Sequence, residues 1–168
     1  MECIKGLLPT KLEASMFLGD MNAYKEALYK IFRRDFIDQE LFHGSKRVDI
    51  IHERFFENKE RSFWHIISEG DEDYSRTPIS WRAETLSWAR VLISEDGTCS
   101  EYKKWIKYHD KTKRNRVYIW CVAANYMVIL EDRGLFYKLI TAYPVNENRV
   151  SAYKSDYDKY VKNENAHQ

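Results

Sequence analysis

Glycine, proline and cysteine are scarce in this chain, which has six, three and three of them among its 168 residues. Long apolar runs are lacking as well: none approaches the roughly 20 residues that span a bilayer, and residues 1–5 lack the apolar core of a signal peptide. Cys3, Cys99 and Cys121 are an odd number at wide spacings, so they predict neither a disulfide framework nor a zinc site. We therefore expect a soluble, cytoplasmic protein without a membrane partner.

Net charge is nearly absent too. The chain has 27 basic and 26 acidic residues and a formal charge of +1, so overall charge predicts no nucleic-acid partner, and any such attraction must come from a local patch. Aromatic residues make up 15% of the chain, which favours a packed globule over disorder. The length fits one domain, with or without a helical extension.

Motifs for metal and cofactor chemistry are also missing. The sequence has no Gly-rich phosphate loop and no Ser-His-Asp spacing. Its five histidines are scattered, and no two have the spacing of metal ligands; they are His43, His52, His65, His109 and His167. We expect no metal and no other cofactor, which leaves hydrolytic chemistry that side chains carry out alone.

Hydrophobic periodicity divides the chain into three parts. Residues 1–40 carry two apolar stripes at helical spacing, over 7–21 and 27–36, and predict an N-terminal helical extension. In residues 41–147 we predict a helix at 80–94 and strands at 47–56, 62–68, 116–122, 126–131 and 135–143. Residues 148–168 predict a C-terminal helix with a frayed tail, because apolar and tyrosine side chains recur there at helical spacing.

The last predicted strand ends in Thr141-Ala142-Tyr143-Pro144. Strict alternation puts Leu135, Tyr137, Leu139, Thr141 and Tyr143 on one face, so two hydroxyls would end an apolar row. Hydroxyls there can bind a phosphate or a substrate at the edge of the sheet. The alternative is structural, since most strand hydroxyls bond to neighbours or water.

Basic and aromatic residues alternate between positions 102 and 116. Basic groups can follow a phosphate backbone while aromatic faces stack on bases, so this zone predicts RNA binding. The alternative is a solvated helix or loop whose aromatic side chains face the core. The candidate RNA-binding residues are Lys103, Lys104, Trp105, Lys107, Lys111, Lys113 and Arg114.

RNA cleavage needs no metal, because the neighbouring 2′-hydroxyl can attack its own phosphate. The protein must then remove one proton, supply another and stabilise charge on the phosphorane. Histidine suits proton transfer near neutral pH, and arginine suits the phosphoryl oxygens by its charge and forked geometry. His65 lies in a predicted strand; Arg82 and Arg90 lie about 12 Å apart along a predicted helix. Each also has a structural alternative, and the sequence does not decide between His52 and His65.

Three of these segments resemble motifs of one family. Residues 63–70 resemble the "FxHI" strand of the phage- and plasmid-encoded nuclease-like domains of the barnase–EndoU–colicin–RelE (BECR) group. Residues 76–95, with Arg76, Arg82, Trp88 and Arg90, resemble the arginine-rich helix of that family. Residues 117–144 resemble its closing strands, which end in "TAYP". The resemblance covers roughly residues 45–147 in order, and it does not include the N-terminal forty.

The resemblance implies an α+β fold, in which helices pack on a small antiparallel sheet with a metal-independent ribonuclease site on its open face. It implies catalytic roles for His65, Arg82, Arg90, Thr141 and Tyr143. Our leading hypothesis is therefore a toxin-like endoribonuclease whose partners are RNA and a cognate inhibitor protein. The alternative is a catalytically inactive module of mobile-element origin that binds protein or nucleic acid.

Overall fold

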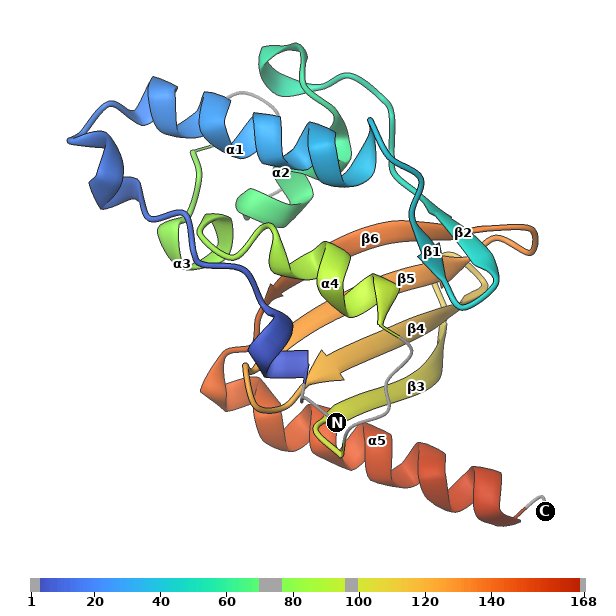
Figure 1. Ribbon diagram of the computed structural model, residues 1–168. Helices are drawn as coiled ribbons and strands as arrows, with labels where there is room; N and C mark the ends of the chain where they lie inside the picture. Colours follow the sequence, from blue (N-terminus) through green and yellow to red (C-terminus); the bar gives the residue numbers. More distant parts are fainter. Residues whose placement is uncertain (1–3, 70–76, 96–99, 167–168) are drawn as a thin grey trace.

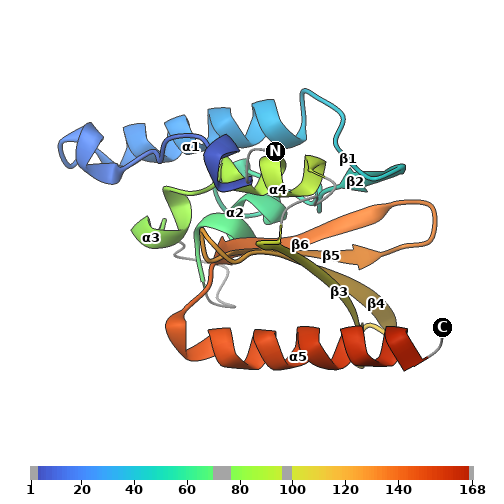
Figure 2. The same cartoon turned by 60° about the horizontal axis from the view of Figure 1, so that its bottom comes forward.

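A six-stranded sheet separates two helical layers of unequal size (Figures 1 and 2). The computed structural model describes residues 4–69, 77–95 and 100–166. Four helices lie on one face of the sheet and one long helix lies on the other (Figure 2). In chain order the helices and strands are α1 Met21–Phe36, β1 Phe42–His43, β2 Lys46–Asp49, α2 Arg61–Ile67, α3 Ser80–Ala83, α4 Trp88–Ser94, β3 Tyr102–His109, β4 Arg114–Cys121, β5 Tyr126–Asp132, β6 Tyr137–Pro144 and α5 Glu147–Ala166, with 3₁₀ turns at Ile4–Leu7, Ala14–Phe17 and Phe56–Asn58.

The α+β class is confirmed, but the sheet is mixed rather than antiparallel throughout. The strand order is β1-β2-β6-β5-β4-β3. The β2–β6 pair is parallel, whereas the other neighbouring pairs are antiparallel. The parallel contact is short, because only Val48 and Asp49 of β2 pair with β6. Most of the outer edge of β6 is therefore left without a strand neighbour in the described part of the chain.

The meander of β4, β5 and β6 follows the predicted strands closely. Its turns are placed by residues that tolerate positive φ: Asn125, at 49°, and Gly134, at 83°. The Asn125 side-chain amide donates to the carbonyl of Val145, and the Gly134 N–H donates to Asp132. Both turns thus satisfy backbone groups that the strands leave open.

The predicted alternation along β6 is wrong beyond Leu139, because a β-bulge interrupts it. Leu130 pairs with Leu139, but the preceding Ile129 pairs with Thr141, so Ile140 is the extra residue. Leu139 consequently faces the helices α1, α2 and α4, while Tyr143 packs towards α5. The two hydroxyl residues do not continue the row of Leu139, and Leu135 lies in the turn before the strand.

Helix α2, at Arg61–Ile67, replaces the strand predicted at 62–68. Phe63, Trp64, Ile66 and Ile67 are buried and lie within about 160° of the helix circumference, at 100° per residue. The run fits a helical stripe, but it is too short for periodicity to distinguish a helix from a strand. The predicted single helix at 80–94 is interrupted by a turn at 84–87, which separates α3 from α4. Residues 102–116 form most of the β3–β4 hairpin, so the alternative of a helix or loop is wrong.

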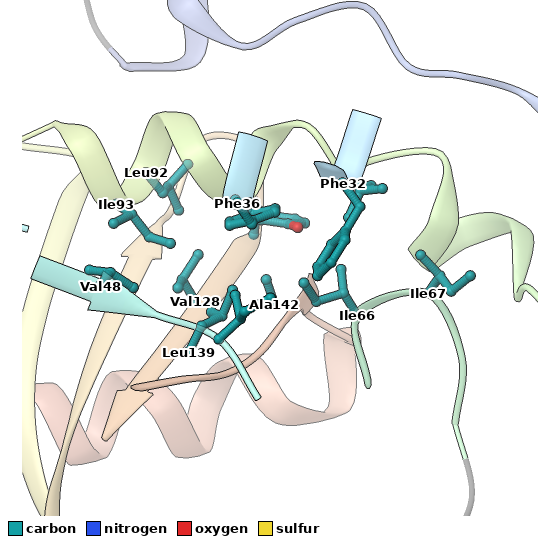
Figure 3. Packing of buried hydrophobic residues seen from close by; sticks show 14 of the residues in the cluster. Phe32, Phe36, Val48, Ile66, Ile67, Leu92, Ile93, Val128, Leu139 and Ala142 are labelled. Carbon is teal, nitrogen blue, oxygen red and sulfur yellow. The ribbon is translucent and has the colours of Figure 1, made fainter. Parts of the chain in front are cut away.

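The core between the sheet and the upper helices includes the N-terminal segment. Figure 3 shows Phe32 and Phe36 of α1 pointing towards the sheet residues Leu139 and Ala142. Asp20 caps α1 by accepting a hydrogen bond from the Ala23 N–H. The apolar stripe predicted at 27–36 therefore lies in a core helix, α1. The stripe predicted at 7–21 instead includes the 3₁₀ turns at Ile4–Leu7 and Ala14–Phe17 and ends at the first residue of α1.

The opposite face of the sheet packs against α5. Tyr153, Tyr157 and Tyr160 pack on Trp105 and Trp120 of the sheet, together with Val150. This confirms the helix predicted from tyrosine spacing. In the described residues, no helix has the length and apolar character needed to cross a membrane.

We predict that Phe32→Ala lowers the free energy of unfolding by about 3–5 kcal/mol, since Phe32 is fully buried between α1 and the sheet. Urea denaturation measures this change. Leu18→Ala is the matched control, because Leu18 is 97% exposed and its truncation should alter stability by less than about 0.5 kcal/mol. Equal stability of both variants would contradict the placement of α1 in the core.

Candidate functional site

The candidate site lies where α2 covers the outer edge of β6. Thr141 points its hydroxyl at α2, and Oγ1 donates to the carbonyl oxygen of His65 at 3.1 Å. The C-terminal half of α2 thus occupies the place where a neighbouring strand would otherwise pair. Two sequence-predicted residues, distant along the chain, are thereby brought into contact.

Arg82 of α3 completes this contact from inside the protein. Its Nη2 donates to the His65 carbonyl at 2.9 Å and to Thr141 Oγ1 at 3.1 Å, and its Nε donates to the Ile66 carbonyl at 3.1 Å. Carbonyls in the last turn of a helix have no partner within it, so Arg82 caps α2 and places a positive charge at its negative end. Arg82 is only 8% exposed, and these bonds fix the orientation of its guanidinium.

The remaining edge of that guanidinium faces an open hollow. Nη1 donates to the Glu69 carboxylate at 3.0 Å, and the Glu69 side chain is 56% exposed. A hollow of about 510 Å³ begins here, and a second cation, Arg149, also lines it. Its other described lining residues are Trp81, Tyr143, Pro144, Asn146, Asn148 and Tyr153. The arrangement is suited to an anion, and the exposed Glu69 carboxylate occupies that place in the structure.

Tyr143 forms one wall of the hollow. The central carbon of the Arg82 guanidinium lies 5.2 Å from the centroid of the Tyr143 ring, within cation–π range. The hydroxyls of Tyr143 and Tyr153 are 2.7 Å apart. Burial, followed by the hydrogen bond with Tyr153, raises the pKa of Tyr143 far above its usual value. Tyr143 is therefore a neutral hydroxyl at physiological pH and not a base.

His65 contributes its backbone carbonyl oxygen to the site. The neighbours Trp64 and Ile66 are buried, whereas His65 is half-buried. Among the described residues that line the hollow, His65 is not included. The structure thus brings Arg82, Thr141 and Tyr143 together with the His65 carbonyl.

Arg90 does not join this group. Its Nη1 donates to the Asp35 carbonyl, and its Nη2 donates to the Glu40 carbonyl at 3.2 Å. These bonds tie α4 to the end of α1 and to the segment before β1. The expectation that one helix presents both arginines is corrected, because the turn between α3 and α4 ends the common helical axis.

The predicted RNA-binding set is divided by the β3–β4 hairpin. Trp105 is 1% exposed and stacks on Tyr118 with ring centroids 5.1 Å apart, so it is a core residue and cannot stack on a base. Lys103 lies over the ring of Tyr157 at 4.1 Å, and Lys107 forms an ion pair with Asp156 at 2.8 Å. Both lysines are thus engaged with α5.

The remaining basic residues are exposed, but those of the hairpin turn lie far from Arg82. Lys104, Lys111, Lys113 and Arg114 have exposed side chains. The last three lie at the turn end of β4, whereas Pro144 lies level with the other end, through the pairs Cys121–Tyr126 and Tyr126–Pro144. Since β4 has eight residues, these ends are about 23 Å apart.

His52 forms a separate pair with Asp49. Its Nε2 lies 2.7 Å from the Asp49 carboxylate, and the His52 side chain is 59% exposed. Burial raises the pKa of Asp49, but hydrogen bonds from His52 and the Ile50 N–H outweigh that effect and hold the pKa below its usual value. The pair follows the short β2 contact with β6, and His52 does not line the hollow beside Arg82.

Potential metal ligands are not grouped in the described part of the structure. Within residues 4–69, 77–95 and 100–166, no group of three or more histidine, cysteine, aspartate or glutamate side chains could hold a metal ion. Cys3, Arg76, Cys99 and His167, which entered the sequence interpretation, lie outside the described residues.

Sequence reasoning missed Trp81, Glu69 and Arg149 as residues of the hollow. Glu69 and Arg149 meet Arg82 only through the tertiary structure, and no spacing along the chain marks that meeting. No pattern in the sequence marks Trp81 either, which is 42% exposed beside Arg82 in α3.

We predict that Thr141→Val, which keeps the side-chain shape and removes the hydroxyl, lowers the free energy of unfolding by about 1–3 kcal/mol. The change removes the Oγ1 contacts with the His65 carbonyl and with Arg82. Thr141→Ser is the matched control, because it retains the hydroxyl and should recover most of the stability in urea denaturation. If Val and Ser variants unfold alike, the hydroxyl contacts contribute nothing.

No family model matches the chain, and neither does any curated protein or solved structure. The likeness to the BECR group therefore depends on the motifs at 63–70, 76–95 and 117–144 alone. Function has to be inferred from the contacts and charges of the site itself.

Proposed function

We propose that this protein is a metal-independent endoribonuclease whose phosphate site is the hollow beside Arg82. One observation carries the proposal: a nearly buried guanidinium is oriented by three protein oxygens and turns its last edge towards an open, cation-lined hollow. At that edge it meets a single exposed carboxylate, from Glu69. A phosphate of RNA carries the same charge and matches the same donors.

The proposed chemistry is attack of the 2′-hydroxyl on its own phosphate. Arg82 and Arg149 would stabilise the negative charge that grows on the phosphoryl oxygens, and an arginine already oriented needs no rearrangement to do so. Tyr143 would act as a neutral donor, because its raised pKa keeps the phenol protonated. Thr141 would act by positioning Arg82. Lys111, Lys113 and Arg114 would guide longer RNA from the far end of the sheet, and Lys104 from the edge strand β3.

Proton transfer is assigned to His65 in this proposal. It lies on the helix that Arg82 caps, and its half-buried side chain is not sealed in the core. His52 is the competing candidate, because it already has a carboxylate partner in Asp49. The toxin-like role, with a cognate inhibitor as partner, belongs to the same proposal and follows from the motif resemblance.

One observation favours the rival, a non-catalytic binding module. Every bond that orients Arg82 also joins α3 to α2 and β6, so the same residue is accounted for by stability alone. In that case the hollow would bind a phosphate or an acidic group without chemistry. The two functions differ in whether a histidine is needed.

We predict that the purified protein cleaves total RNA in EDTA, and that His65→Ala lowers the rate roughly 10²- to 10⁴-fold, the usual contribution of a general acid or base. Gel analysis of the RNA measures cleavage, and thermal unfolding verifies that the variant is folded. His52→Ala, tested in parallel, identifies which histidine transfers the proton. Equal background cleavage by wild type and both variants would exclude the enzyme, and a requirement for a divalent ion would exclude the mechanism.

We predict that Glu69→Gln tightens binding of single-stranded RNA roughly 2- to 5-fold at low salt, because it removes a charge that competes with phosphate at Arg82. Fluorescence anisotropy with a labelled oligonucleotide measures the affinity. The gain should shrink as salt is raised. Glu164→Gln, an exposed change near the end of α5, is the control for net charge alone. The phosphate site is misplaced if both changes have the same effect.

A further inference from the structure

A second hollow continues the first across the start of α5. It measures about 500 Å³ and shares Trp81, Pro144, Asn146 and Asn148 with the hollow beside Arg82. Val145 and Glu147 complete its described lining. The two hollows form one groove, which we call the α3–α5 groove, with a cationic end at Arg82 and Arg149 and an aromatic and amide end beyond.

Trp81 forms the aromatic wall of this groove. Its side chain is 42% exposed, although indole is among the largest apolar groups and its burial is normally favoured. The Arg82 guanidinium carbon lies 5.8 Å from the centroid of its ring. Because Arg82 is anchored inwards by α2 and β6, the adjacent Trp81 is held outwards, beside Pro144. The groove therefore presents an apolar surface directly beside a cation.

Asn146 and Asn148 line both hollows with Trp81 and supply hydrogen-bonding groups. Asn146 caps α5: its Oδ1 accepts from the Asn148 N–H at 3.1 Å, and its carbonyl accepts from the Arg149 N–H at 2.8 Å. Within the described part of the chain, the Asn146 Nδ2 group and the whole Asn148 amide have no protein hydrogen-bond partner. A side-chain amide carries both donors and an acceptor, so it can pair with the edge of a planar heterocycle.

We propose that the α3–α5 groove binds one unstacked nucleobase of RNA, next to the phosphate at Arg82. The base stacks on Trp81, and its edge pairs with the amides of Asn146 and Asn148. One groove thus combines a cation, an exposed aromatic face and free amide groups, which are the partners that the phosphate, the ring and the ring edge of a nucleotide require. This inference rests on the proposed RNA substrate, and it makes the groove, not the distant basic hairpin, the site that recognises bases.

The test uses 2′-O-methyl RNA pentamers, which bind as RNA does but cannot be cleaved by 2′-hydroxyl attack. Affinity is measured by fluorescence anisotropy for the intact pentamer and for pentamers that lack the base at each position in turn.

For the wild-type protein, removal of the base at one position should weaken binding markedly. Trp81→Ala should weaken binding of the intact pentamer roughly 5- to 100-fold, as expected for loss of a base–aromatic stack, and should abolish the effect of the missing base. Trp81→Phe should retain most of the affinity.

Phe42→Ala is the matched control, because Phe42 is also an exposed aromatic residue, 44% exposed. It lies in β1, whose neighbour β2 pairs with the end of β6 opposite to Pro144. This variant should bind every pentamer as the wild type does. If removal of no base changes wild-type affinity, or if folded Trp81→Ala still responds to the missing base, the inference is overturned. The base scan on the wild type requires no variant to fold.

Cleavage is measured separately on unmodified RNA. If base binding depends on Trp81 but the protein does not cleave RNA, the inference about the groove is supported and the proposed catalysis is wrong. If the protein cleaves RNA but binds the pentamers equally with and without Trp81, the proposed catalysis is supported and the inference about the groove is wrong.

Discussion

The unpaired outer edge of β6 is the constraint on which the rest of this structure depends. β2 pairs with Tyr137 and Lys138 only, and the strand beyond them has to be covered by other means. A helix, α2, covers it, but a helix brings open carbonyls at its own C-terminus. Arg82 satisfies two of these carbonyls and the Thr141 hydroxyl together. The candidate site is therefore a consequence of how an open edge of the sheet is closed.

The same bonds that stabilise this edge prepare Arg82 for an anion. A long, flexible side chain normally loses conformational freedom when it binds a ligand. Here that loss has occurred on folding, since three oxygens already hold the guanidinium. Among the described residues, the interaction with the largely exposed Glu69 carboxylate is the one that a ligand would have to replace. Stability and the proposed phosphate binding are thus compatible at Arg82, because its inner edge is bonded to α2 and β6 and its outer edge faces the groove.

Helix α5 determines which aromatic residues remain available to a ligand. It covers Trp105 and Trp120 and engages Lys103 and Lys107, so the middle of the basic hairpin becomes an interface within the protein. Its first turn has the opposite effect. Among the described residues, the Asn146 Nδ2 group and the Asn148 amide have no protein partner there, beside Trp81, which is 42% exposed. Helix α5 thus covers part of the β3–β4 hairpin, which the sequence predicted to bind bases. Its first turn borders the α3–α5 groove, which we propose as the base site.

The sequence by itself determined those features that depend on neighbouring residues: the strands of the β4–β6 meander, the amphipathic α1 and the tyrosine-spaced α5. It also indicated Arg82, Thr141 and Tyr143 by motif. Only the tertiary structure decided that 61–67 is a helix, because a short apolar run fits a helix and a buried strand alike. The tertiary structure also decided that a bulge at Ile140 turns Tyr143 away from Leu139. It likewise separated Arg90 from Arg82 and brought Glu69 and Arg149 together. Such meetings depend on hydrogen bonds and packing between segments far apart in the chain, which no local pattern records.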